Sequence, residues 1–149
     1  MKGSRRLRPV ARVAQHRERD AARQLGNSLR QAEQQQKQLD SLIEYRDQYV
    51  TSFKNAGEQG LSAVQMRDYQ LFLRRLDSAI MQQQQKLVAS RQNCDLSQAD
   101  WQNKHGRSKM IDKVVEKREQ TETHRLDAQE QREQDDRPKD SFNGDRSDD

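Results

Sequence analysis

The apolar residues between positions 66 and 115 recur at intervals of seven, and this repeat most constrains the fold. The main series consists of Met66, Leu73, Ile80, Leu87, Cys94, Trp101 and Val115. A companion series, three residues later in each heptad, contains Tyr69, Leu76 and Ile111. Two helices that wrap around each other need an apolar repeat of about 3.5 residues to keep a continuous seam. The pattern therefore predicts long coiled-coil helices, a form without a cleft for a substrate.

The composition agrees with this prediction. Only 30% of the 149 residues are hydrophobic and 35% are charged, which is too apolar-poor for a compact globule. No apolar stretch approaches the roughly 18 residues of a membrane span, and we expect no signal peptide. The single cysteine, Cys94, cannot form an internal disulfide, which is typical of a cytoplasmic protein.

A first helix is expected at about residues 8–54, because Pro9 is tolerated in a first helical turn. Its apolar residues follow alternating steps of four and three residues, as the seam of a coiled coil does. The predicted seam positions are Leu25, Leu29, Ala32, Gln36, Leu39, Ile43, Arg46, Val50 and Phe53.

A turn is predicted at residues 55–61, where Gly57 and Gly60 can end a helix and reverse the chain. Ser62 and Gln65 then have the spacing of a capping box, so a second helix is expected at about residues 62–131. A short loop makes the two helices antiparallel neighbours. The predicted fold is all-α, a long antiparallel two-helix coiled coil over residues 1–137, with a disordered acidic tail at 138–149.

Centring the turn near Glu58 places Val10 opposite Gly106. The second helix is then expected to lack an intramolecular partner beyond Gly106, although that segment contains apolar residues that suggest a surface for another protein. They are Met110, Ile111, Val114 and Val115. Polar residues weaken the preceding seam, and we expect loose packing there. They are Ser90, Ser97, Lys104 and Ser108.

The charge is distributed unevenly along the chain. Residues 1–30 contain nine Lys or Arg against two acidic residues, whereas residues 127–149 contain nine Asp or Glu against four basic residues. The basic end predicts an acidic partner. Nucleic-acid binding is the less favoured alternative, because no aromatic residues are interleaved with the basic ones to stack on bases.

A stripe of residues on the second helix lies beside the main ladder. Its members are Phe72, Leu76, Ala79 and Gln83, spaced by four, three and four residues. A narrow seam cannot bury both this stripe and the adjacent residues Leu73 and Ile80. Two interpretations remain open: a wider seam with Phe72 folded over the first helix, or a docking face for a partner.

No catalytic, cofactor or metal site is expected from the sequence. The histidines His16, His105 and His124 are scattered, without a cysteine or acidic pair at metal-ligand spacing. The chain contains no glycine-rich phosphate loop, so it is not expected to bind a nucleotide itself. We therefore predict that the protein is not an enzyme.

Two segments carry a resemblance to a known family. LRPVARVAQHRERDAARQLGNSLRQAE (residues 7–33) and LSAVQMRDYQLFLRRLDSAI (residues 61–80) are similar to the FliJ family of flagellar export proteins. The resemblance covers roughly residues 5–130. It implies a hairpin like the coiled coil of the rotary ATPase gamma subunit. It also implies a cytoplasmic protein that is peripheral to the cell membrane at the flagellar base.

The resemblance further implies a stalk or adaptor that promotes assembly and activity of the hexameric export ATPase ring, FliI. It implies contacts with the export gate protein FlhA and with export chaperones, without nucleic acid and without an obligate homo-oligomer. The implied gate-binding residues are Phe72, Leu76, Ala79 and Gln83. The implied ATPase-ring residues are Arg5, Arg6, Arg8, Arg12, Arg19, Met110, Ile111, Val114, Val115 and Lys117. A stalk protein of an injectisome secretion system has the same architecture and is the alternative.

Overall fold

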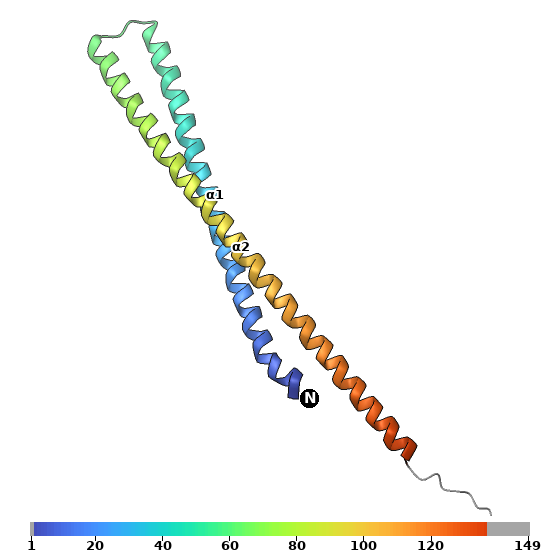
Figure 1. Ribbon diagram of the computed structural model, residues 1–149. Coiled ribbons are helices and arrows are strands. Elements are labelled where there is room, and N and C mark those ends of the chain that lie inside the picture. Colours follow the sequence, from blue (N-terminus) through green and yellow to red (C-terminus); the bar gives the residue numbers. More distant parts are fainter. Residues whose placement is uncertain (1, 137–149) are drawn as a thin grey trace, which may run out of the picture. The chain divides into compact units, whose positions relative to one another are not determined.

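The computed structural model describes residues 2–136, and this part of the chain consists of two long helices without a strand (Figure 1). Helix α1 spans Lys2–Gly57 and helix α2 spans Ala63–Asp136. Segments of the two helices pack against each other in antiparallel fashion, so the predicted all-α helical hairpin is confirmed. Neither described helix contains a stretch apolar enough to cross a lipid bilayer.

The helices divide into two compact units, each built from one segment of α1 and one of α2. The first unit, here called the terminal unit, contains the described residues 2–15 and 106–136. The second, here called the turn unit, is His16–His105.

The chain reverses between Gly57 and Ala63 in the turn unit. The backbone N–H groups of Gln59 and Gly60 donate to the carbonyls of Ala56 and Gly57, at 3.1 and 3.2 Å. Gly60 has φ of 91°, a left-handed conformation that a side chain would disfavour. The chain therefore reverses at a position that requires glycine.

The predicted capping box starts α2. The Gln65 N–H donates to the Ser62 hydroxyl at 3.1 Å, and the Ser62 N–H donates to Gln65 Oε1 at 3.0 Å. These reciprocal bonds satisfy two N–H groups that a helix start leaves without intrahelical partners. The sequence prediction for this helix start is confirmed.

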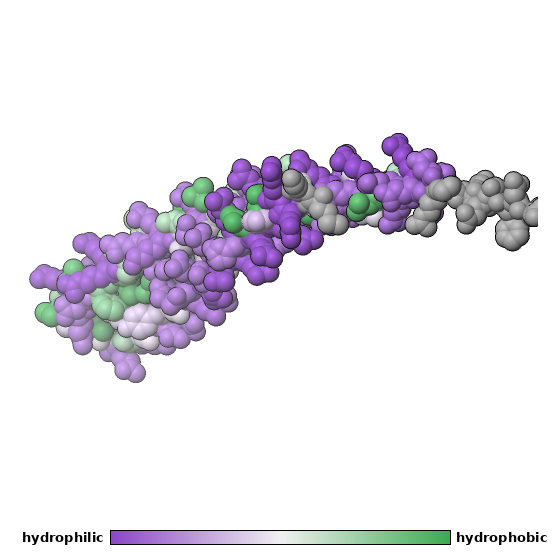
Figure 2. Space-filling model, turned by 90° about the horizontal axis from the view of Figure 1, so that it is seen from below, coloured by the Kyte–Doolittle hydropathy of each residue, from purple (hydrophilic) through white to green (hydrophobic). Residues whose placement is uncertain are grey.

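Most predicted heptad positions of α2 face α1, although Met66, the first of them, is 43% exposed. Leu76 and Leu87 are buried, and Leu73, Ile80 and Cys94 are half-buried. Hydrophilic side chains cover most of the visible surface in Figure 2, where hydrophobic ones appear in small groups. The burial of α2 therefore follows its apolar period, as a two-helix seam requires.

The seam of α1 differs from the prediction in its second series. Ser28 is 6% exposed, whereas the predicted neighbour Leu29 is 55% exposed, and Ile43 is also exposed. The Ser28 and Ser97 hydroxyl oxygens lie 2.9 Å apart, and the Gln83 side-chain amide donates to the Gln35 carbonyl at 3.0 Å. The predicted seam positions Leu29 and Ile43 are wrong, because both residues are exposed, and at the first of them Ser28 is the buried residue instead.

Of the seam positions expected to pack loosely, Ser108 is buried, whereas Ser90, Ser97 and Lys104 are half-buried. In the turn unit Ala21 is 2% exposed, and in the terminal unit Ser108 is 2% exposed. These small residues are more buried than any leucine of the described chain. Small side chains allow two helix axes to approach closely, so they bury well although they contribute little apolar surface.

Helix α1 starts at Lys2 rather than near residue 8. The Ser4 N–H and hydroxyl donate to the Glu122 carboxylate at 3.3 and 2.9 Å. A carboxylate at a helix N-terminus satisfies otherwise unpaired N–H groups and interacts favourably with the helix dipole. This contact from α2 supports the turns before Pro9, and no local sequence signal could predict it.

Candidate docking surfaces

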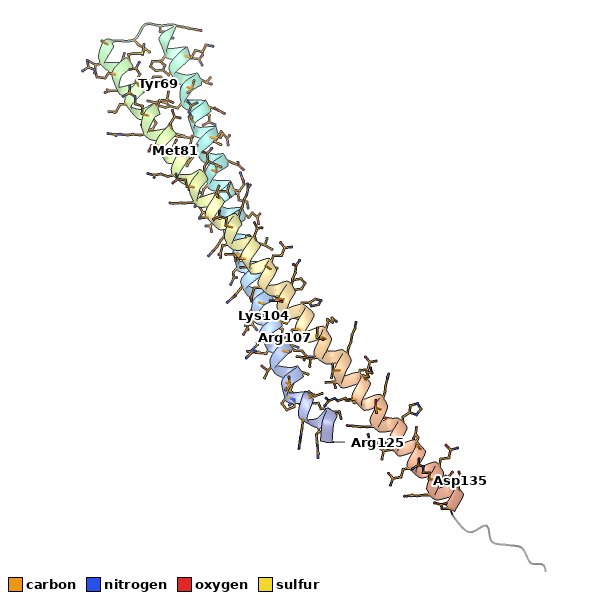
Figure 3. The ribbon with its side chains drawn as sticks, viewed as in Figure 1. Tyr69, Met81, Lys104, Arg107, Arg125 and Asp135 are labelled. Carbon is orange, nitrogen blue, oxygen red and sulfur yellow. The ribbon has the colours of Figure 1, made fainter. Side chains whose placement is uncertain are left out.

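Five aromatic residues form a cluster next to the turn. They are Tyr45, Tyr49 and Phe53 on α1, and Tyr69 and Phe72 on α2. The labelled Tyr69 in Figure 3 lies between the two helices near the turn. Because a stacked or edge-to-face ring pair contributes about 0.5–1.5 kcal/mol beyond its buried area, the cluster holds this part of the hairpin together.

Phe72 packs over α1 within this cluster. Its ring centroid lies 4.5 Å from that of Tyr49, and 6.3 Å from that of Tyr45 in a T-shaped pair. Phe72 is half-buried, so one edge of its ring remains accessible. The structure agrees with the first interpretation, in which Phe72 is folded over α1, and the docking face remains a prediction.

The other members of the predicted gate-binding stripe divide in the same way. Ala79 is half-buried, whereas Leu76 and Gln83 are buried in the seam at 7% and 6% exposure. The Gln83 amide also donates to Gln35 Oε1 at 2.6 Å, which fixes its orientation. Within the stripe, partner contact therefore stays a prediction for Phe72 and Ala79, whereas Leu76 and Gln83 belong to the seam between the helices.

A shallow groove of about 520 Å³ continues the accessible edge of the stripe away from the turn. Its walls come mainly from α1, with Gln83 contributed by α2. The lining residues are Gln34, Lys37, Gln38, Ser41, Leu42 and Gln83. Side-chain amides and a hydroxyl dominate the lining, so the groove offers hydrogen-bond donors and acceptors.

On the opposite edge of the turn unit, Arg46 and Asp77 form an ion pair of 2.6 Å. The Asp77 hydrogen bond raises the pKa of the Arg46 guanidinium above its ordinary value. Gln36 accepts a hydrogen bond of 2.8 Å from Arg91 on the same edge. Polar bridges thus close this edge, whereas aromatic rings and the groove occupy the other.

The terminal unit contains most of the predicted ATPase-ring residues. Arg5, Arg6, Arg8 and Arg12 are exposed, and Lys117 is exposed on α2. Arg19 is also exposed but belongs to the turn unit. The structure therefore groups all the predicted basic ring residues except Arg19 in one unit.

The predicted overhang beyond Gly106 is wrong. Arg8 pairs with Glu119 at 3.6 Å and Ser4 contacts Glu122, so α1 accompanies α2 at least to Glu122. The chain reverses at Gly60 rather than at Glu58, which shifts the pairing toward the α2 C-terminus. Helix α1 also begins earlier than expected, which lengthens the paired region at the same end.

The apolar residues of this α2 segment separate into two groups. Ile111 and Val115 are half-buried, whereas Met110 and Val114 are 68% and 41% exposed. A partner surface made from this segment therefore consists of Met110 and Val114, with Ile111 and Val115 turned inward.

Glu122 provides a pH-dependent contact in the terminal unit. The Ser4 hydrogen bonds hold the pKa of its carboxyl below the ordinary value. A lowered folded-state pKa means that the carboxylate stabilises the contact fully above the ordinary pKa. The stabilisation is lost as the pH falls through the lowered value.

We therefore expect Glu122→Gln to loosen the start of α1 at neutral pH and to have little effect in acid, where wild-type Glu122 is itself neutral. Hydrogen–deuterium exchange of residues 3–10 in both proteins, compared at each pH, measures this difference directly. Glu130→Gln, at an exposed site on the same helix, is the control. The prediction would be contradicted if the difference in exchange between wild type and Glu122→Gln were as large in acid as at neutral pH.

The histidines have structural surroundings. The His105 ring stacks on Trp101 with centroids 4.9 Å apart, and its Nδ1 lies 2.5 Å from a Glu18 carboxylate oxygen. His16 lies 3.4 Å from Asp20, one helical turn away. Among the residues that the structure describes, no group of three or more potential metal ligands comes together.

Sequence reasoning missed the α1 side of the aromatic cluster, including Tyr45. Tyr45 precedes the seam position Arg46, just as Phe72 precedes Leu73. The sequence did contain a signal for this contact: on each helix, an aromatic residue stands one position before a seam residue. Which α1 residue meets Phe72 depends on the register between the helices, and the expected register was displaced.

The sequence of the chain matches a known protein family. The family model described as "Flagellar FliJ protein" matches residues 2–145. The chain belongs to the flagellar FliJ protein family. This confirms the resemblance of residues 7–33 and 61–80, and extends it over nearly the whole chain.

Two curated members of the family are similar to the chain. The flagellar FliJ proteins of Escherichia coli (strain K12) and Salmonella typhi are each 33% identical over 88 residues, or 59% of this chain. The aligned part spans 60% of the length of each relative. None of the solved structures matches the chain.

Proposed function

We propose that the chain is a non-enzymatic stalk and adaptor of the flagellar protein export apparatus. Membership of the flagellar FliJ family supports this role over that of an injectisome stalk. The observation that carries the proposal is the separation of two different surfaces into two units. The turn unit presents an aromatic edge with a polar groove. The terminal unit presents exposed arginines on α1, and the exposed Met110 and Val114 on α2.

Each surface suits a different kind of partner. Exposed arginines favour an acidic protein surface, and their attraction weakens as salt screens it. An accessible aromatic edge favours a partner that buries it, because aromatic residues anchor many protein interfaces. We assign the terminal unit to the export ATPase ring and the aromatic edge to the export gate, with the protein held at the membrane through these partners. Export chaperones are further expected partners.

The experiment that tests the stalk role is the ATPase rate of the purified export ATPase, with and without the full chain, at several salt concentrations. We expect substoichiometric chain to raise the rate and to promote ring assembly, with the stimulation declining as salt increases. The chain alone should hydrolyse no ATP. An unchanged ATPase rate and unchanged ring assembly at every salt concentration would contradict the stalk role.

Nucleic-acid binding is the competing explanation for the exposed arginines. It predicts a gel shift whose affinity falls linearly with salt on logarithmic axes, as counterion release requires. A shift that disappears at moderate salt, combined with ATPase stimulation that persists there, would assign the basic residues to the protein partner.

A further inference from the structure

We infer that the turn unit self-associates through the edge opposite the aromatic rings, so that two hairpins pack side by side as a dimer. The occupant of this edge is a second copy of the chain. This self-association goes beyond the proposed stalk role and does not depend on it. Exposed apolar rows on both helices, flanked by opposite charges, are the features that fit a second copy.

The α1 half of this edge contains an exposed apolar row. Leu29 and Ile43 are 55% and 39% exposed, and each lies seven residues from Gln36. Positions seven residues apart lie on the same side of a coiled-coil helix, so the row shares the edge on which Gln36 contacts Arg91. Val50 extends the row by another seven residues and is half-buried. The row stands outside the seam of the hairpin and is accessible to a partner.

The α2 half of the edge repeats this pattern. Met81 and Val88 are 62% and 53% exposed and lie seven residues apart. Met81 follows Asp77 by four residues, so it lies one helical turn from a residue that bridges to α1 on this edge. Val88 precedes Arg91, a second bridging residue, by three residues. Exposed apolar residues scattered singly need no partner, but rows at heptad spacing on two adjacent helices form a surface that further helices can cover.

A two-fold axis parallel to the helices makes this edge complementary to itself. Such an axis places α1 of one copy opposite α2 of the other, at the same level along the helices. Within one copy Arg46 lies opposite Asp77 and the helices are antiparallel, so Ile43 lies at about the level of Met81. In the dimer, Ile43 of each copy therefore faces Met81 of the other, and both apolar side chains leave water.

Opposite charges flank the facing apolar residues. Asp47 follows Ile43 by four residues on α1, and Arg74 precedes Met81 by seven residues on α2. Both are exposed, and within residues 2–136 neither takes part in an ion pair. The antiparallel register places the two residues within about one helical turn of the same level, so the two-fold axis brings Asp47 of each copy to Arg74 of the other. An acidic residue on α1 and a basic residue on α2 thus fit a second copy of the same edge.

Sedimentation velocity of the full chain over a range of concentrations tests this dimer. We expect the wild-type mass to rise with concentration toward that of two chains. Met81→Glu should raise the dimer Kd at least about tenfold, because the charge enters the apolar contact of both copies. Leu96→Glu is the matched control, since Leu96 is 71% exposed and lies on the other side of α2, next to the heptad row that contains Phe72. Far-UV circular dichroism checks that both variants remain helical.

A charge exchange separates direct pairing from a structural effect. Asp47→Arg and Arg74→Asp should each raise the dimer Kd at least about fivefold, because each places like charges opposite one another. The double variant restores opposite charges without changing the net charge, so its Kd should return to within about twofold of the wild-type value. A purely structural role of either residue predicts no such rescue. Stimulation of the ATPase should persist in all these variants, because that contact is assigned to the terminal unit.

A wild-type chain that stays monomeric at its highest soluble concentration would overturn the dimer. Equal losses from Met81→Glu and Leu96→Glu, or no recovery in the double variant, would place the contact elsewhere and overturn the proposed interface. If the wild-type chain is monomeric and Met81→Glu instead weakens binding to an export chaperone, the occupant of this edge is the chaperone. ATPase stimulation by a monomeric chain would leave the stalk role intact, so failure of the dimer is distinguishable from failure of the proposed function.

Discussion

Leu87→Ala is expected to lower the free energy of unfolding by about 2–3 kcal/mol, near the lower end of the range for buried leucines. Leu87 is 6% exposed at a seam position of α2, so truncation removes buried methyl groups and leaves a gap against α1. The higher helix propensity of alanine offsets only a few tenths of a kcal/mol. Urea unfolding followed by far-UV circular dichroism measures the change.

Val88→Ala is the matched control for Leu87→Ala. Val88 is the next residue of the same helix and is 53% exposed, so its truncation should change the free energy of unfolding by less than about 0.5 kcal/mol. Equal losses from the two substitutions would mean that α2 presents a different face to α1.

Replacing Arg5, Arg6 and Arg8 together by Glu is expected to abolish most of the stimulation of the export ATPase. Reversing three charges on one surface replaces attraction to an acidic partner by repulsion, an electrostatic effect of roughly tenfold or more on association. Helicity should remain, because Arg5 and Arg6 are exposed, and the Arg8 change replaces an exposed ion pair with Glu119 by an exposed like-charge contact that water screens. A titration of the ATPase rate against variant concentration measures the loss.

The matched control for this variant reverses three exposed arginines of the turn unit, Arg67, Arg74 and Arg75. It changes the net charge by the same amount but should leave ATPase stimulation nearly intact. Equal loss from both triple variants would indicate an effect of net charge. Wild-type stimulation by the first variant would remove the three arginines from the ATPase contact.

The sequence predicted those parts of the fold that depend on local or periodic signals. The reversal at Gly60 and the cap at Ser62 are local, and the period of α2 appears in its own apolar residues. These features need no knowledge of the partner helix, because glycine conformation, side-chain capping and helical period are properties of short segments.

Features that depend on pairing between distant residues were not predictable from the same signals. Leu29 is the more apolar candidate for the seam, yet Ser28 is the buried residue, and its hydroxyl lies 2.9 Å from that of Ser97. The early start of α1 depends on Glu122, which lies 118 residues from Ser4 in the sequence. In each case the register between the helices decides which residues come into contact, and polar contacts across the seam set that register.

The candidate docking residues show the same division. Phe72 and Ala79 were recognised on α2 because they break the regular heptad pattern, and the exposed arginines were recognised from charge alone. Tyr45 and the groove were missed because they become neighbours of Phe72 only after the hairpin has formed.

The unequal sequence separations of the contacts also give the hairpin a preferred order of assembly. Arg46 and Asp77 are 31 residues apart, whereas Ser4 and Glu122 are 118 apart, so the second closure costs roughly 1 kcal/mol more chain entropy if each forms alone. Folding is thus expected to nucleate at the aromatic rings beside the turn and to zip toward the chain ends. The basic end closes last and opens first, so a partner that binds there acts on the least stable part of the hairpin.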